Sequence, residues 1–360
     1  MSGVAAMMGV TSSISGGGGG ATVDTDFVFK VSMGSGGSFN IPHYPGLNYN
    51  YNVDWGDSSN STNVTNSPSH TYGSGTFTIR ISGTFPAIFF DNTGDRLKVA
   101  SVDNLGDVGW TTFDEAFFGC SNMTSFTAGA GANTASVTDM NQMLRNCTSL
   151  TSVDLSDFDT SEVLTMTNTF RNCNSLTTLD LSTFNTEKVT TMREMFFDCI
   201  DLTTLDISNF NTSSCTSFYQ MFRDCDSLTS IDVSSFSAGT SSTGSVTTMN
   251  AMFRECTLLT DIPGVENFDI TGLSGTSALT NFMVSGGSLP TTRYDTLLDK
   301  WEAQAGQISA QSPHFGTSKY SASQMYDGVN DTPEGSRHNL VQPTASGGYG
   351  WTITDGGQAA

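Results

Sequence analysis

The chain has 360 residues, 37% of them hydrophobic, and a formal net charge of −21 from 14 Lys and Arg against 35 Asp and Glu. This length can hold two or three domains with a substantial core. Clustered basic residues are needed to bind nucleic acid or anionic lipid, and no run of 18 apolar residues occurs, so neither nucleic-acid binding nor membrane insertion is expected.

Residues 1–22 are expected to form a flexible anchor peptide with a glycine linker. The five-glycine run at 16–20 has no side chains to pack, which makes it flexible. The peptide before this run is mildly apolar, and Met7, Met8 and Ile14 are its candidate anchor residues, which would dock on a larger assembly. It has no basic n-region, so no secretory signal is expected.

The next segment, residues 23–95, has the pattern of an all-β module. Alternating residues at 51–54 and 75–81 predict exposed strands joined by Gly, Ser and Asn turns. The Trp-Gly-Asp motif at 55–57 and the His-Thr-Tyr motif at 70–72 resemble those of PKD domains. This resemblance implies an immunoglobulin-like β-sandwich.

Several residues of this module could have either of two roles. Trp55 and Tyr72 are expected in the core of the sandwich rather than in a sugar-stacking platform. Asp54, Asp57 and Asn60 offer oxygen atoms that can either cap turns or bind Ca²⁺, and turn capping is the expected role.

A repeat of fixed period occupies residues 96–285. Six cysteines are separated by 27, 26, 26, 26 and 31 residues: Cys120, Cys147, Cys173, Cys199, Cys225 and Cys256. Leucine and phenylalanine columns keep the 26-residue step: Leu150, Leu176, Leu202 and Leu228; Phe158, Phe184, Phe210 and Phe236. A period of this size predicts a solenoid of stacked coils.

Each unit is expected to contain a short helix and a strand. Apolar residues at steps of three and four over 189–199 predict one or two helical turns, and 202–207 predicts a strand. Neighbouring thiols of the cysteine column would have parallel Cβ directions, which is wrong for a disulfide, so buried free thiols are expected. No Cys-x-x-Cys pair occurs, and no metal site is expected.

The sequence Met-Phe-x-x-Cys-x-x-Leu-Thr-x-Leu-Asp-Leu-Ser-x-Phe-Asn-Thr, carried by 195–212 and its neighbours, resembles the BspA-like leucine-rich repeats, also called DUF285 repeats. The resemblance covers about residues 100–284. Such repeats occur in bacterial surface adhesins, mycoplasma lipoproteins and bacteriophage structural proteins. It therefore implies a binding or scaffold role rather than catalysis.

Residues 286–360 are expected to cap the last coil. Tyr294, Leu297, Leu298 and Trp301 fall on one face of an amphipathic helix that begins after Pro290. The predicted fold class is thus multidomain, with an immunoglobulin-like (PKD) β-sandwich, a leucine-rich-repeat α/β solenoid of 26-residue coils, and a C-terminal cap.

No enzyme, catalytic residue or cofactor is expected, because the four histidines form no close pair and the acidic residues of the repeats are periodic. Outward positions of the strands are the candidate ligand-facing ladder. They comprise hydroxyls at Thr177, Thr203 and Thr229 and carboxylates at Asp180, Asp206 and Asp232. These rows suit an extended glycan or a basic protein surface, although they could equally satisfy turns and solubilise the sheet.

The predicted function is a virion structural protein, a fibre, appendage or decoration subunit, located in the virion. Its N-terminal peptide would bind other virion proteins and its repeats would attach to a host-surface glycan or protein. A bacterial cell-surface leucine-rich-repeat adhesin is the alternative. An adhesin needs an export signal, which favours the virion; homo-oligomer formation stays open.

Overall fold

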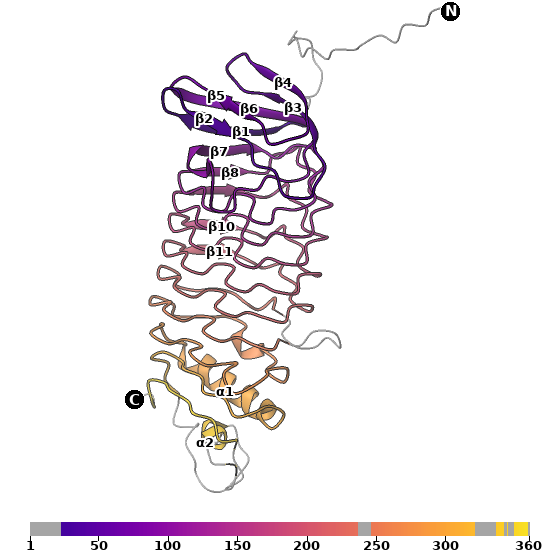
Figure 1. The fold of residues 1–360 in the computed structure, drawn as a ribbon. Coiled ribbons are helices and arrows are strands. Elements are labelled where there is room, and N and C mark those ends of the chain that lie inside the picture. The colour runs from indigo at the N-terminus through magenta and orange to yellow at the C-terminus, as the bar shows by residue number, and fades with distance from the viewer. Residues whose placement is uncertain (1–22, 237–245, 321–335, 342–343, 345–348, 359–360) are drawn as a thin grey trace, which may run out of the picture.

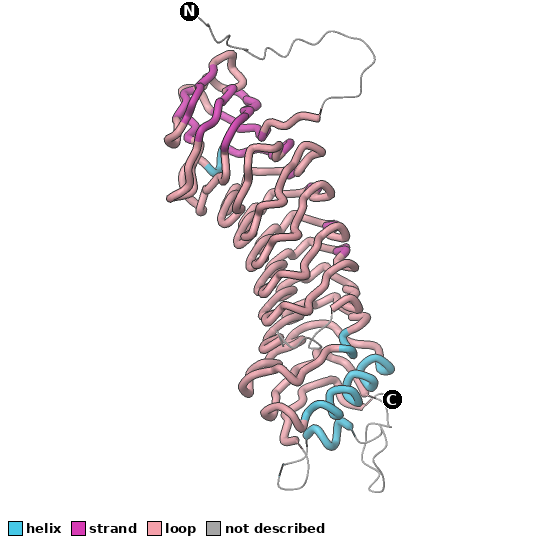
Figure 2. The backbone as a smooth tube through the Cα atoms, turned by 90° about the vertical axis from the view of Figure 1, so that its right-hand side faces the viewer, coloured by secondary structure: helices cyan, strands magenta, loops and turns pink. Residues whose placement is uncertain are grey.

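The structure, a computed structural model, describes residues 23–236, 246–320, 336–341, 344 and 349–358. These residues form an elongated stack of coils with most of the strands at one end and the two α-helices at the other (Figure 1). Between these ends the chain runs mainly in turns and loops (Figure 2). The candidate anchor residues Met7, Met8 and Ile14 lie outside the described residues.

The strands near the start of the chain form one mixed sheet. Its seven strands follow the order β4-β3-β6-β1-β7-β8-β9. Their bounds are β1 Phe27–Met33, β3 Asn50–Asp54, β4 Asn60–Val64, β6 Gly75–Thr84, β7 Val99–Asn104, β8 Ser125–Thr127 and β9 Ser152–Asp154. Strands β2 (Ser38–Asn40) and β5 (Ser69–Thr71) form a separate antiparallel pair.

This sheet contradicts the predicted separate β-sandwich. Strand β1 lies inside the sheet, antiparallel to both β6 and β7. Strand β7 then pairs in parallel with β8, and β8 with β9, so the sheet passes from the N-terminal module into the first repeats without a break. The physical reason is that Phe27, Phe29 and Val31 of β1 are fully buried in the same continuous core as the repeats, so the two regions share one sheet.

The predicted α/β solenoid is also wrong, because the repeats contain turns where helices were expected. Over the described part of 111–284 the helical element is the 3-10 helix η2 (Val265–Asn267); η1 (Arg96–Lys98) precedes this region. In 189–199, Glu194 and Asp198 have positive φ values of 54° and 60°. A right-handed helix cannot continue through such residues.

Backbone hydrogen bonds explain why the turn wins over the helix. The N–H groups of Glu194, Phe196 and Asp198 donate to carbonyls of the next coil at 2.9, 2.9 and 2.8 Å. A helix would instead use these donors within its own turn. Stacking therefore satisfies the backbone between coils, and the strained left-handed residues are held in place by it.

The 26-residue period is the register of the stack. Strand β10 (Thr178–Asp180) pairs in parallel with β11 (Thr204–Asp206), and Leu179 lies opposite Leu205. Buried phenylalanine rings stack between coils, with centroids of Phe170 and Phe196 5.7 Å apart and those of Phe196 and Phe222 5.5 Å apart. The six cysteines of the column are buried, as predicted, and Cys215 is buried as well; all seven are free.

The predicted amphipathic helix is present at the other end of the stack. Helix α1 (Thr291–Ala305) buries Tyr294, Leu297, Leu298 and Trp301. The Trp301 ring centroid lies 5.8 Å from that of Phe282 in the last repeat. The short helix α2 (Ser336–Val341) follows later in the chain. Within the described ranges, no helix combines the length and apolar character that a membrane crossing requires.

Candidate binding face

Three-residue strands turn alternate side chains outward from the stack. In β10, Leu179 is 3% exposed and faces the core, whereas Thr178 and Asp180 are exposed. Strand β11 repeats this alternation in register, with Thr204 and Asp206 exposed. Because β-strand side chains alternate in direction, each coil presents the same two outward groups.

The predicted threonines lie on the surface, but one of their hydroxyls is used to hold coils together. Thr177, Thr203 and Thr229 are all exposed. The Thr203 hydroxyl donates to the carbonyl of Thr177 at 3.0 Å, and the Thr260 hydroxyl donates to the carbonyl of Thr229 at 3.1 Å. Hydroxyl groups of this threonine column therefore form hydrogen bonds between neighbouring coils.

The predicted aspartates are exposed and cap turns with one carboxylate oxygen. Oδ1 of Asp180, Asp206 and Asp232 accepts the N–H two residues later at 2.9, 2.9 and 2.8 Å. The hydrogen bonds from Ser182 hold the pKa of Asp180 below its usual value. Among the described residues, the ion pairs of these coils form elsewhere, as between Lys188 and Glu162, so the aspartate row keeps its charge.

The sequence prediction missed a second hydroxyl column. Thr178 and Thr204 lie directly opposite each other, two positions before the aspartates on the same side of their strands. The signal was available, since hydroxyl residues recur with the 26-residue step at this position. We define the hydroxyl–carboxylate face by these two exposed columns: Ser152, Thr178, Thr204 and Ser230; Asp154, Asp180, Asp206 and Asp232.

A small hollow of about 110 Å³ lies on this face, between neighbouring coils. It is lined by Asp154 and Asp180, with Val153, Leu155, Ser156 and Thr183. A hollow of this volume holds a few water molecules or one small polar group, because one water molecule takes up about 30 Å³ of liquid. The face is therefore slightly concave between these two coils.

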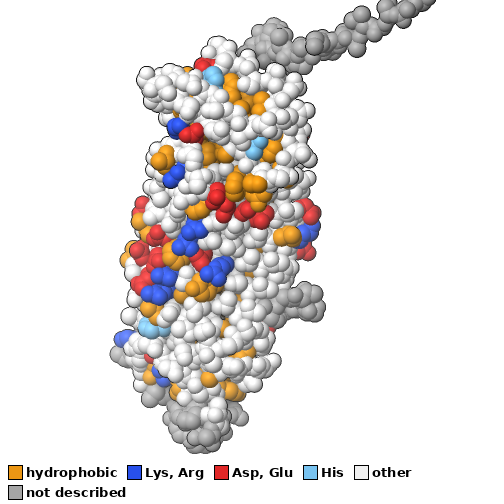
Figure 3. All heavy atoms as spheres, viewed as in Figure 1, with side chains coloured by type: hydrophobic (Ala, Val, Ile, Leu, Met, Phe, Trp, Pro, Cys, Tyr) orange, Lys and Arg blue, Asp and Glu red, His pale blue; other side chains and the backbone are white. Residues whose placement is uncertain are grey.

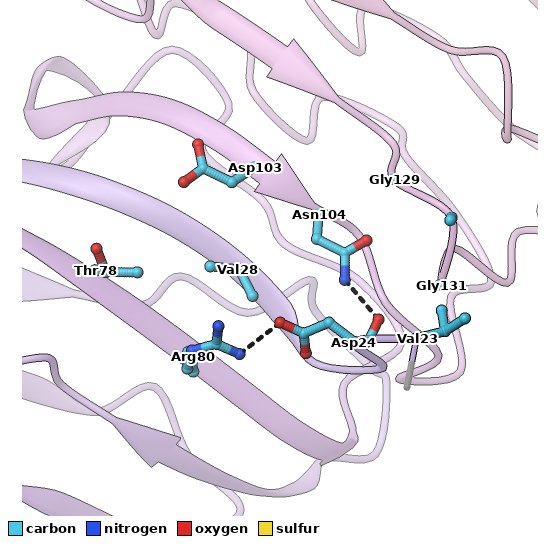
Figure 4. Close-up of a pocket in the computed structure, with 10 residues that line it drawn as sticks. Val23, Asp24, Val28, Thr78, Arg80, Asp103, Asn104, Gly129 and Gly131 are labelled. Carbon is cyan, nitrogen blue, oxygen red and sulfur yellow. Dashed lines mark hydrogen bonds and ion pairs between the residues drawn. The ribbon is translucent and has the colours of Figure 1, made fainter. Parts of the chain in front are cut away.

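A larger hollow of about 410 Å³ lies further along the same sheet, at the junction of β1, β6 and β7 with residues 129–131 (Figure 4). The cation that lines it, Arg80, points to Asp24 at 2.7 Å. The side-chain amide of Asn104 donates to the carbonyl of Asp24 at 2.8 Å. Because Asp24 already pairs with the Arg80 cation, this hollow has little attraction for an anionic ligand.

Ser59, Asp57 and His70 converge in a way that superficially suggests catalysis. The His70 Nε2 lies 2.7 Å from Asp57 Oδ2 and 3.3 Å from the Ser59 hydroxyl. A Ser-His-Asp relay needs the serine and the aspartate on different ring nitrogens, and here both face Nε2. Hydrogen bonds from Ser59 and His70 lower the pKa of Asp57 to about 2, as in a turn cap.

Turn capping also accounts for Asp54, whose Oδ1 accepts the N–H of Gly56 at 2.9 Å. Over the residues with described positions, no three His, Cys, Asp or Glu side chains are grouped so as to hold a metal ion.

The fold and this face define a repeat protein of stacked coils. Residues 111–236 and 167–281 match the model of a family described as "Mycoplasma protein of unknown function, DUF285". Among solved structures, the chain is similar to the crystal structure of a leucine rich cell surface protein from Faecalibacterium prausnitzii, with a TM-score of 0.28 and 17% identity. That match covers 69% of this chain and 74% of that chain. A comparison with curated proteins found no match.

The resemblance to DUF285 repeats is therefore confirmed over the repeats. Neither finding points to a PKD domain or to a bacteriophage protein.

Proposed function

We propose that the protein is a non-enzymatic binding protein of a bacterial cell surface that presents its stacked coils to a polar ligand. The observation that carries the proposal is the hydroxyl–carboxylate face, in which Thr178 and Asp180 stand in register with Thr204 and Asp206. Such rows repeat at about the 4.8 Å spacing of paired strands. A regular row of this kind suits an extended ligand with repeated polar groups.

The exposure of this face supports binding over catalysis. Enzyme sites are generally concave and exclude water, because buried charges act more strongly on a reacting group. The hydroxyls and carboxylates of this face are instead exposed on short strands, with a hollow of only about 110 Å³ between two coils. Hydroxyl donors beside carboxylate acceptors suit the hydroxyl groups of a glycan.

The proposed location at a cell surface rests on the resemblance to BspA-like repeats and on the DUF285 match over 111–281. The virion role was the first expectation from the sequence. Nothing in the comparisons supports it, and the anchor residues on which it depended lie outside the described residues. The surface adhesin is therefore the function we propose.

The proposal is tested by binding of the purified protein to an array of neutral and acidic glycans and to intact cells. Asp206→Lys places a cation in the row and is expected to lower binding. Glu187→Lys makes the same charge change at an exposed position outside the row and is the matched control. If both variants and the native protein bind equally, the hydroxyl–carboxylate face takes no part in binding. If the native protein binds no glycan and no cell, the proposed function is refuted.

A further inference from the structure

A second surface concentrates the basic side chains of the repeats. Of the six Lys and Arg between residues 111 and 281, only Lys188 lies outside equivalent turns of successive coils. The other five are Arg145, Arg171, Arg193, Arg223 and Arg254. We call these five arginines, together with the aromatic residues Phe197 and Tyr219, the arginine stripe. Figure 3 shows Lys and Arg side chains gathered over the middle of the stack, interleaved with acidic and hydrophobic side chains.

Aromatic rings hold several of these guanidinium groups in place. The Cζ atoms of Arg171 and Arg223 lie 4.2 and 5.0 Å from the centroid of the Phe197 ring between them. Arg193 lies over Tyr219 at 4.3 Å. Stacking fixes the planar guanidinium group, so less entropy is lost when it forms hydrogen bonds to a ligand.

The stripe has more hydrogen-bond donors than acceptors. Arg171 and Arg193 share one carboxylate, that of the buried Glu194. Arg145 donates to the neutral amide of Gln142. Each guanidinium group has five N–H donors, so most of these donors are left for solvent or a ligand.

Three of the described Nε donors lack a hydrogen bond but are buried, so the donors open to a ligand are the terminal N–H groups. Nε of Arg145, Arg171 and Arg223 is buried without a hydrogen-bond partner in the part of the chain that is described. Nε of Arg223 lies 3.3 Å from Asp224, close enough for an ion pair but not aligned for a hydrogen bond. Burial and the charges of Arg145, Arg193 and Arg223 lower the pKa of Arg171, against the opposing charge of Asp198, and an anion bound there would relieve the remaining repulsion.

We infer that the arginine stripe binds an acidic polysaccharide through its carboxylate or sulfate groups. Planar guanidinium groups pair with such anions through two parallel hydrogen bonds. The inference rests on the proposed binding function and adds a second face to it. All five basic residues of the stripe are arginines, which fits this bidentate recognition better than lysines would.

The carboxylates beside the stripe favour a glycan over other polyanions. Asp198, Asp224 and Glu255 directly follow Phe197, Arg223 and Arg254 in the chain. The deoxyribose-phosphate backbone of DNA has no internal hydroxyl group that could donate to these carboxylates. Sugar hydroxyls between the anionic groups can donate to these carboxylates, whereas the side chains of an acidic peptide such as polyglutamate carry no donor.

The test measures the affinity of the full-length protein for immobilised heparin and polygalacturonate, with dextran, polyglutamate and single-stranded DNA as comparisons. Arg193→Gln with Arg254→Gln removes two charges and spares the Arg171, Phe197 and Arg223 stack. Lys188→Gln with Lys300→Gln removes two charges elsewhere and is the matched control. We expect the stripe variant to lose at least about tenfold in affinity for an acidic glycan, and the control variant to stay within about twofold.

Each other outcome overturns the inference. An equal loss in both variants would mean non-specific attraction, and equal binding to polyglutamate or DNA would mean another class of partner. If the native protein binds dextran or cells but no acidic glycan, the stripe inference fails while the proposed function stands. If it binds no glycan and no cell, both fail. Matching circular dichroism spectra and melting temperatures would exclude misfolding of a variant.

Discussion

The Sγ of Cys199 donates a hydrogen bond to the carbonyl oxygen of Phe170, one coil earlier, at 3.1 Å. The same contact recurs between coils along the cysteine column, at Cys147, Cys173, Cys225 and Cys256. The thiol thus fills a small apolar space and also supplies a weak buried donor. Burial raises the pKa of Cys199 to about 12.

Thiol labelling tests this use of the cysteine column. Because the thiolate is the reactive form, the buried and protonated thiols are expected to resist alkylation at pH 8 in the native protein. After addition of denaturant all seven are expected to react. Mass spectrometry counts the labelled sites, and rapid labelling of the native protein at Cys199 would contradict the buried column.

The leucine column is expected to set the stability of the stack. Leu179 is 3% exposed, and Leu179→Ala should lower the free energy of unfolding by about 2 to 5 kcal/mol. Thr178→Ala changes the exposed neighbour and should cost less than about 0.5 kcal/mol. Urea unfolding measures both, and a similar small change in the two variants would place Leu179 outside the core.

His43 is expected to make the N-terminal sheet sensitive to acid. Its ring stacks on that of Tyr49 with centroids 3.7 Å apart, and its Nε2 lies 2.8 Å from the Tyr51 hydroxyl. Burial lowers the pKa of His43 from 6.5 to about 4. Between these values the unfolded chain binds a proton and the folded chain does not, so stability is complete above pH 6.5 and declines as the pH falls to 4.

The size of this effect is at most about 3 kcal/mol for a shift of this kind. His43→Phe keeps an aromatic ring and removes the titration. We expect the native protein to lose more unfolding free energy between pH 7 and pH 4.5 than this variant, by about 1 to 3 kcal/mol. Parallel pH curves for the two proteins would exclude His43 as the cause.

Asp355 joins the two C-terminal helices. Its carboxylate is 4% exposed and accepts from the Tyr294 hydroxyl at 2.8 Å and from Arg337 Nε at 2.9 Å. Asp355→Asn keeps the shape but removes the charge that Arg337 faces. The expected loss is about 1 to 3 kcal/mol of unfolding free energy, against less than about 0.5 kcal/mol for Asp201→Asn at an exposed position.

Periodicity in the sequence predicted the columns of the stack well, because each column depends on one position repeated in every coil. The 26-residue step is the register that places Leu179 opposite Leu205. Helix α1 was predictable because its four large apolar residues all fall on one face. Both features depend on local pattern alone.

The helical turns within the repeats were wrongly predicted because apolar spacing does not report backbone handedness. A second signal was present, since Gly119, Asn146 and Asp198 belong to one column of residues that tolerate the left-handed region, and all three have positive φ. The continuous sheet could not be read from the sequence. The pairing of β1 with β7 joins segments about 70 residues apart, and alternation in a strand does not identify its partner.

The most direct test of the central claim compares glycan or cell binding by the native protein with binding by the double variant Asp180→Lys and Asp206→Lys. Both changes lie on exposed positions and leave Leu179 and Leu205 in place. The account predicts that the dissociation constant rises at least about tenfold, whereas loss of the two turn caps lowers the melting temperature by only a few degrees. An unchanged dissociation constant would show that the hydroxyl–carboxylate face takes no part in binding.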